Sequence, residues 1–307
     1  MDYNTLVEKA CVYLGQPVDP NLKVPVALGE VADVTTVPAG EIVKVFDDDT
    51  ATDNIYTVNA NGVISVHKLS KAAASELTFA HYNTKLEYIL VNELLDAEDQ
   101  GYLMRKKASF TRALDKLEVK RVVTLCESLT NQAVLQGSGD VFDVIRAMLE
   151  KIEDYGDNYI LLVGTTTNSL INSYDKDNAD NFHYDVGLKK WLVDNKITPI
   201  KLVGKLNVDG GGENPLIGSD DAILIARNSS IADGKPIKFV RRMIDPAIAE
   251  MMGVKPDEAQ RAIFISNTPV PVSAGSLNTL AFGAYAYESV ILACTNSRAI
   301  SFCLAIS

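Results

Sequence analysis

Three histidines, His67, His81 and His183, are the only side chains of this 307-residue sequence that could act as an imidazole base. Nucleophilic catalysis needs such a base within hydrogen-bond reach of a nucleophile, together with a third group that orients it. His67 and His81 fall in strand-like segments and His183 in a loop rich in Asn and Asp, and none belongs to a recognisable motif. The sequence therefore predicts no catalytic residues and no enzyme activity.

Metal and cofactor chemistry is also poorly supported. The sequence contains no H-E-x-x-H or C-x-x-C motif, and these are common arrangements of zinc ligands. Two acidic stretches, 47–53 and 175–180, lack the glycine and terminal glutamate of a calcium-binding loop, so we interpret them as solvated turns. We expect no bound metal or cofactor. Four cysteines are interpreted as reduced thiols packed as small apolar groups: Cys11, Cys126, Cys294 and Cys303.

A run of three glycines, Gly210, Gly211 and Gly212, is the best candidate for a phosphate-binding loop. Such a loop joins a strand to a helix and places a lysine and a Ser or Thr near the phosphates. Here the glycines lead into an Asn-Pro dipeptide, and the flanking Asp209 and Glu213 would repel a phosphate. We therefore predict a mobile surface loop at this place.

Composition and charge narrow the class of protein. Apolar residues make up 47% of the chain and charged residues 22%, as in soluble globular proteins, and the length allows one large core or two joined ones. Forty acidic against 29 basic residues give a net charge of −11, which disfavours a free-standing nucleic-acid-binding protein. The N-terminus has no signal-peptide pattern, and no apolar run reaches the roughly 18 residues of a membrane span, so we expect a soluble protein without membrane contact.

The N-terminal part of the chain has the pattern of extended elements. Residues 1–15 have the spacing of a short amphipathic helix, and the four prolines between 16 and 40 predict an extended arm. Residues 42–46 have the composition of a strand. Two β-branched runs, 55–58 and 63–66, flank an Asn-Gly turn and predict a projecting hairpin, because glycine after asparagine tolerates the positive φ of a tight reversal.

The strongest helical signal runs from about residue 96 to 136, with apolar residues mostly three, four or seven positions apart. Four basic residues lie seven, four and four positions apart and form one stripe on this helix: Arg105, Arg112, Lys116 and Lys120. A solvated helix face is the simpler interpretation of this stripe, because charge runs commonly do no more than solubilise a helix.

The rest of the chain alternates helices and strands before becoming strand-rich. Asp140 is placed to cap a helix that closes at Gly156, and the apolar run 160–163 predicts a buried strand followed by a helix from about residue 168. A short helix is expected at 187–193. Further strands are predicted at 200–203, 222–226, 237–240, 262–265, 280–287, 290–293 and 299–304.

The succession of these elements resembles the major capsid proteins of tailed bacteriophages, whose shell-forming fold is shared with encapsulins. The resemblance rests on the stretch from Leu77 to Asp96 before the long helix and on the closing pattern from Ala284 to Ile300. It implies an α+β fold, the phage major capsid fold, with an extended β-hairpin loop, a long spine helix and a mixed α/β axial domain. The implied boundaries are 1–40 for the N-terminal arm, 41–84 for the extended loop, 85–156 for the peripheral domain, 157–278 for the axial domain and 279–307 for the return to the peripheral domain.

The same resemblance implies a structural subunit that self-assembles into hexamers and pentamers of an icosahedral head around double-stranded DNA. The protein would be part of the virion, would assemble in the host cytoplasm, and would meet portal and scaffolding proteins. Packaged DNA would be contacted weakly and without sequence specificity, with the basic stripe facing the lumen. The expected assembly contacts are Tyr56, Asn61, Gly62, Lys68 and Lys71.

Some members of that family crosslink a lysine of the extended loop to an asparagine of a neighbour, with a glutamate as the base. Lys68 and Lys71 lie near the lysine position. Leu280 stands at the approximate acceptor position and Tyr287 at that of the base, so we expect no covalent crosslink. Two alternatives to a phage head stay open: an encapsulin-type compartment that encloses cargo protein, and a cytoplasmic α/β enzyme that uses the loop at Gly210.

Overall fold

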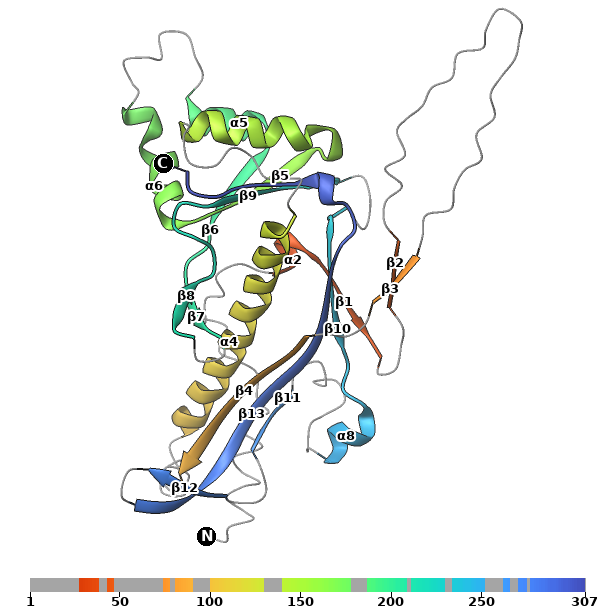
Figure 1. Cartoon of the computed structure of the whole chain (residues 1–307), viewed down its shortest axis with the longest axis vertical. Coiled ribbons are helices and arrows are strands. Elements are labelled where there is room, and N and C mark those ends of the chain that lie inside the picture. Colours follow the sequence, from red (N-terminus) through yellow and green to blue (C-terminus); the bar gives the residue numbers. More distant parts are fainter. Residues whose placement is uncertain are drawn as a thin grey trace, which may run out of the picture.

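The computed structural model of the chain describes a long sheet with one helix beside it, and a helical layer over a smaller sheet at one end (Figure 1). The fold is mixed α/β, as the sequence predicts. The described residues are 28–38, 43–46, 74–77, 81–90, 100–129, 140–177, 187–208, 211–229, 234–251, 262–265, 270–274 and 277–306.

The long sheet is built around one strand, β13 (Leu277–Cys294). Its residues 284–287 pair antiparallel both with β4 (His81–Leu90) and with β11 (Ala262–Ile265), so these two strands lie on opposite edges of β13. The start of β13 pairs with β12 (Val270–Ala274), and its end pairs with β10. Every strand of this sheet except one therefore contacts β13 directly.

The exception is β1 (Asp33–Val37), which pairs parallel with β10 (Ile237–Arg242). It follows the short helix α2 (Leu28–Val31), whose two terminal residues are buried. The sequence predicted an extended arm throughout 16–40, and this is wrong for residues 28–37, which belong to the folded body. The prolines at 25 and 38 only flank this stretch, and they leave its N–H groups free to pair.

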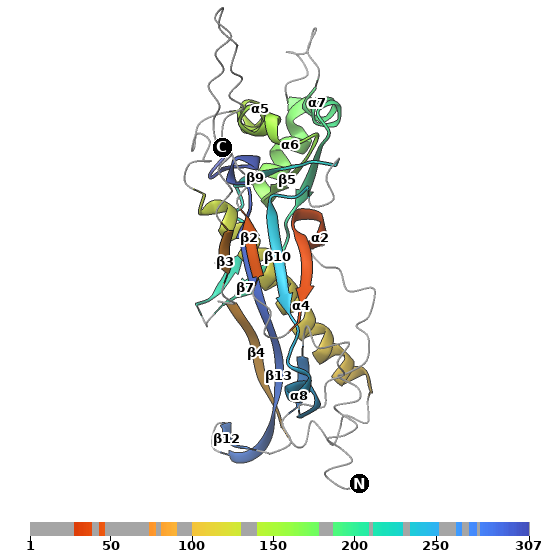
Figure 2. The same cartoon turned by 90° about the vertical axis from the view of Figure 1, so that its right-hand side faces the viewer.

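The smaller sheet has four strands in the order β14 (Ile300–Cys303), β9 (Ala222–Arg227), β5 (Asn158–Val163) and β6 (Ile197–Lys201). Parallel strands β5 and β6 are connected through α6 (Thr165–Asp177) and α7 (Leu188–Asp194). Helix α5 (Val141–Ile152), continued by the 3-10 turn η2 (Glu153–Tyr155), packs on β14 and β9, while α7 packs on β6. Figure 2 shows α5, α6 and α7 next to one another on one side of this sheet.

Strand β5 separates two hydrophobic cores, which is why its sequence is apolar at consecutive positions. Ile160 and Leu162 belong to the core formed with the long helix and the long sheet. Leu161 and Val163 belong to the core formed with α5, α6 and α7. All four side chains are at most 1% exposed, so the predicted buried strand is confirmed.

The remaining elements lie outside these two sheets. They are α4 (Gln100–Glu127), α8 (Pro246–Met251), the 3-10 turn η5 (Ser297–Ala299), the strand pair β2 (Val43–Phe46) and β3 (Ala74–Leu77), and the hairpin β7 (Lys205–Asn207) and β8 (Glu213–Pro215). The stretch 157–278, which the resemblance assigns to the axial domain, does not form one sheet. Its strands β10, β11 and β12 pair with β13 in the long sheet. Helix α5, assigned from sequence to the peripheral domain, packs instead on the smaller sheet.

Candidate assembly elements

The spine helix α4 is fastened to the long sheet by a buried ion pair. Glu118 is 1% exposed and accepts two hydrogen bonds of 2.7 Å, from Nε and Nη2 of Arg241 on β10. The Arg241 guanidinium also lies 5.7 Å from the centroid of the Phe239 ring. Because a bidentate pair fixes orientation as well as distance, it determines how the helix lies against the sheet.

Sequence reasoning did not single out Glu118, although a signal was present. Residues 110, 114, 118, 122 and 126 are four positions apart and lie on one helix face. The other four members of this row are apolar and buried: Phe110, Leu114, Val122 and Cys126. A carboxylate in such a row requires a cation, because an unpaired buried charge is costly. The cation is 123 residues away in sequence, so local spacing could not identify it.

Two lysines of the predicted basic stripe hold a distant segment to the spine helix. Lys116 Nζ donates to the carbonyl of Lys205 at 3.1 Å, and Lys120 Nζ donates to the carbonyl of Leu216 at 3.1 Å. Lys205 begins β7 and Leu216 follows β8, so the two lysines hold the base of the β7–β8 hairpin to α4. A uniformly solvated stripe was the simpler expectation, and it is wrong for these two residues.

The other two members of the stripe differ from these lysines. Arg112 is exposed, and the side chain of Arg105 lies outside the described residues. Burial and the neighbouring Arg112 lower the pKa of Lys116, while the carboxylate of Glu213 opposes this shift. The three described members of the stripe therefore share a helix but differ in environment.

The glycine run lies at the turn of the β7–β8 hairpin. The Gly212 N–H donates to Oδ1 of Asn207 at 3.2 Å, and the Gly211 N–H donates to the carbonyl of Val208 at 3.1 Å; Gly210 is outside the described residues. Gly212 has a φ of +97°, in the region that favours glycine. A strand follows the turn, so these glycines lack the helix that a phosphate-binding loop needs.

The expected assembly contacts on the extended loop lie outside the described residues: Tyr56, Asn61, Gly62, Lys68 and Lys71. The strands that bracket this stretch in sequence pair antiparallel, with Val43 of β2 opposite Leu77 of β3. The two ends of the stretch are therefore held next to each other, while the contacts themselves stay a prediction.

The acceptor and base positions of a crosslink lie on β13. Leu280, at the approximate acceptor position, and Asn278, two residues before it, belong to the part of this strand that pairs with β12. Glu288, the carboxylate next to Tyr287, is 0% exposed in the single chain. A general base must come within hydrogen-bond reach of the amine that it deprotonates, and a carboxylate enclosed by its own chain is closed to a neighbour's lysine. The lack of a crosslink stays our prediction.

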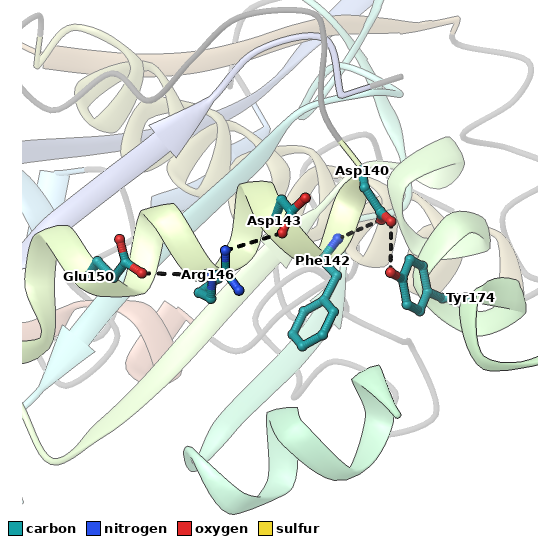
Figure 3. A network of polar contacts seen from close by, with 6 residues as sticks. All are labelled: Asp140, Phe142, Asp143, Arg146, Glu150 and Tyr174. Carbon is teal, nitrogen blue, oxygen red and sulfur yellow. Dashed lines mark hydrogen bonds and ion pairs between the residues drawn. The ribbon is translucent and has the colours of Figure 1, made fainter. Parts of the chain in front are cut away.

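Helix α5 begins at a polar network drawn in Figure 3. Oδ1 of Asp140 accepts a hydrogen bond of 3.1 Å from the Phe142 N–H, which confirms the predicted cap. Oδ2 of Asp140 accepts a bond of 2.7 Å from the hydroxyl of Tyr174 on α6. Burial, helped by this bond to a carboxylate, raises the pKa of Tyr174 to about 12. One aspartate thus caps α5 and joins it to α6.

Within the described ranges, no group of three or more His, Cys, Asp or Glu side chains could hold a metal ion. Asp175 belongs to a stretch predicted to be a solvated turn, but its Oδ1 accepts a 2.6 Å bond from the Leu188 N–H at the start of α7. Of the three histidines, His81 lies on β4, and the other two lie outside the described residues. In the part of the chain that the structure describes, no helix is long and apolar enough to span a membrane.

Three cysteines are described, and none of these three belongs to a disulfide. Cys126 and Cys303 are buried and Cys294 is half-buried, as expected for small apolar groups, while Cys11 is outside the described residues. Burial raises the pKa of the Cys126 and Cys303 thiols. Thiols in such surroundings are inert as nucleophiles.

No family model matches the sequence, and no curated protein matches it. Solved structures do match its fold. A phage-related protein from Bordetella bronchiseptica is similar with a TM-score of 0.52 and 10% sequence identity, over 96% of this chain and 96% of that one. The capsid structure of Cyanophage P-SCSP1u is similar with a TM-score of 0.50 and 11% identity, over 95% of this chain and 91% of that one. A structure from Mycobacterium phage Che8 has a TM-score of 0.50 and 10% identity, over 86% and 84% of the two chains.

These matches extend over most of the chain, so the long sheet, the spine helix and the smaller α/β layer are compared together and not one at a time. At sequence identities of 10% and 11%, the likeness concerns the path of the backbone. This chain therefore has the fold of phage capsid proteins, the fold that its sequence resembles.

Proposed function

We propose that this protein is a structural shell subunit that assembles with copies of itself into a phage head. The observation that carries the proposal is the fold, which is similar to a phage capsid structure over 95% of the chain. The proposed particle is an icosahedral head of hexamers and pentamers around double-stranded DNA. It would be a virion component assembled in the host cytoplasm, with portal and scaffolding proteins as partners.

The internal contacts suit a subunit of this kind. A closed shell is held by many weak contacts that act together, and these contacts add up only if each subunit keeps its shape. The Glu118–Arg241 pair fastens the spine helix to the long sheet, and Lys116 and Lys120 fasten the β7–β8 hairpin to the same helix. The described part of the subunit is therefore braced across its main elements.

The proposal is tested by expressing the full chain alone and examining the product by electron microscopy and analytical sedimentation. We expect closed particles built from hexamers, with pentamers at the vertices. A product that stays monomeric or dimeric at every protein and salt concentration, with or without a scaffolding protein, would refute it. Particles that enclose protein cargo and exclude nucleic acid would indicate the compartment alternative.

We also propose that the basic stripe faces the lumen, through its members Arg105 and Arg112. Lys116 and Lys120 also hold the β7–β8 hairpin, so the test is placed on the two arginines, whose charges would offset repulsion between the acidic wall and DNA. The double variant Arg105→Glu/Arg112→Glu should form particles that hold less nuclease-protected DNA. An unchanged DNA content per particle would remove the stripe from the proposal.

A further inference from the structure

The smaller α/β layer carries a lysine-rich surface on an otherwise acidic protein. Residues 188–201, which form α7 and β6, contain four lysines and one aspartate and so carry a net charge of +3. The whole chain carries −11, which leaves −14 on all other residues. The four lysines of this segment are exposed, and Val193 between them is 73% exposed. We call these five residues the lysine edge: Lys189, Lys190, Val193, Lys196 and Lys201.

The lysine edge is held in a fixed position by contacts beneath it. Asp175 on α6 accepts the N–H of Leu188 at 2.6 Å, and the Trp191 ring meets the Phe142 ring of α5 edge-on at 5.1 Å. Residues 189 and 190 lie four and three positions before Val193, on the same helix face. A partner would therefore meet an apolar side chain next to lysines, on a helix that needs no further ordering.

An acidic surface of matching charge lies on α5 and η2. Residues 140–155 contain five acidic and two basic residues and so carry a net charge of −3. We name four exposed acids of this segment the acidic face: Asp143, Glu150, Glu153 and Asp154. Arg146 lies 3.4 Å from Asp143 and 3.7 Å from Glu150, but its side chain is 57% exposed and those of its partners 66%, so these pairs hold the carboxylates weakly.

The two surfaces lie at opposite edges of one sheet. Helix α7 packs on β6 and helix α5 on β14 and β9, and the strand order β14-β9-β5-β6 places β14 and β6 at the two ends. Figure 2 shows α5 and α7 on the two sides of this layer. The two helices meet where the Trp191 ring contacts Phe142, but residues 189 and 193 each lie two positions from Trp191, about 200° around α7, and so stand on the helix face turned away from α5.

We propose that the lysine edge of one copy docks on the acidic face of the next copy, head to tail. The inference rests on the proposed function, because it names the surfaces that meet within the shell. Two different surfaces on opposite sides of a subunit make a heterologous contact, which repeats into a ring when the rotation closes. Lys189, Lys190 and Lys201, all exposed, supply the charge for the neighbour.

A second copy of this chain fits the lysine edge better than a nucleic acid does. Every copy carries a net charge of −3 over residues 140–155, which equals in magnitude the +3 of residues 188–201. Binding to phosphates depends on charge and gains nothing from an exposed apolar side chain such as Val193. The centre of a protein interface, by contrast, is enriched in apolar side chains.

Charge reversal on each surface tests the contact in the full-length protein. One double variant is Lys189→Glu/Lys190→Glu, and the other is Glu150→Lys/Glu153→Lys. The first variant places acids near the start of α7, and the second places lysines near the end of α5. Both changes are favourable to the helix dipole, so both variants should fold. A control, Lys205→Glu, reverses one exposed lysine on β7, away from both surfaces.

Assembly is followed by light scattering and sedimentation over a range of protein concentrations, with thermal unfolding as the test of folding. Each double variant should need at least about tenfold more protein to assemble, the effect of roughly two reversed surface pairs. The quadruple variant, in which the two surfaces have exchanged charge, should assemble at close to the wild-type concentration, as should the control.

The inference is overturned if wild-type particles form and either double variant assembles at the same concentration, or if the folded quadruple variant regains nothing. Normal particles of Lys189→Glu/Lys190→Glu with less nuclease-protected DNA would assign the lysine edge to nucleic acid, which also overturns it. Absence of particles from the wild-type chain is a different result, because it refutes the proposed function and not the choice of surfaces.

Discussion

Removing Arg241 alone should destabilise the subunit far more than removing both members of its ion pair. In Arg241→Met, the Glu118 carboxylate stays 1% exposed without its bidentate partner. Breaking a buried ion pair on one side costs about 3–5 kcal/mol, because the desolvation of the remaining charge is no longer offset. An unfolding entropy of roughly 2.1 cal/mol/K per residue gives about 0.6 kcal/mol/K for 307 residues. The Tm should therefore fall by about 5–8 °C.

The double variant Glu118→Met/Arg241→Met should recover most of this loss. Replacing both charges by apolar side chains of similar length removes the desolvation cost together with the attraction, so its stability should lie within about 1 kcal/mol of wild type.

Urea and thermal unfolding of the unassembled subunit, followed by circular dichroism, measure these differences. Arg146→Met is the matched control, because Arg146 makes only exposed pairs on α5 and should change the unfolding free energy by at most about 0.5 kcal/mol. Equal losses in the single and double variants, or a loss for Arg241→Met no larger than that of the control, would refute the role given to the buried pair.

Three further outcomes follow from single contacts. Asp140→Ala should lower the unfolding free energy by about 1 kcal/mol in denaturant titrations, because the Phe142 N–H loses its acceptor; an unchanged midpoint would contradict the capping role. Tyr174, with a pKa raised from 10.0 to about 12, stabilises the fold fully below pH 10 and loses this contribution as the pH rises through 12. Ultraviolet titration against Tyr174→Phe checks this, and a phenol titrating at its ordinary pKa would disprove it. Gly164→Ala should abolish soluble subunit, because its Cβ would lie 2.0 Å from the Gly218 carbonyl oxygen, and a normal yield on expression would contradict that close approach.

Local patterns were sufficient for elements whose formation depends on near neighbours. The cap at Asp140 and the apolar spacing after it predicted α5, and the apolar run 160–163 predicted β5. The predicted strand 262–265 has the bounds of β11. Capping, helical periodicity and continuous apolar runs act over a few residues, so they can be recognised without the rest of the fold.

The strand β13 shows where local patterns fail. The sequence pattern predicts two strands, 280–287 and 290–293, with Glu288 and Ser289 between them. The structure has one strand of 18 residues, in which both of these polar residues are buried. Their burial depends on β4 and β10, which pair with this part of β13 from distant parts of the sequence. The residues near Glu288 in the sequence therefore cannot show that it is buried.

By itself, the sequence determined the types of most elements, the acidic net charge and the lack of an assignable catalytic motif, because each depends on composition or on short-range spacing. Only the tertiary structure decided that Glu118 meets Arg241, that two lysines of the stripe hold a hairpin, and that residues 28–37 join the folded body. It also placed the lysine edge and the acidic face at opposite edges of one sheet. These facts follow from strand order and helix packing, which bring together residues far apart in the chain, and charge spacing alone does not contain them.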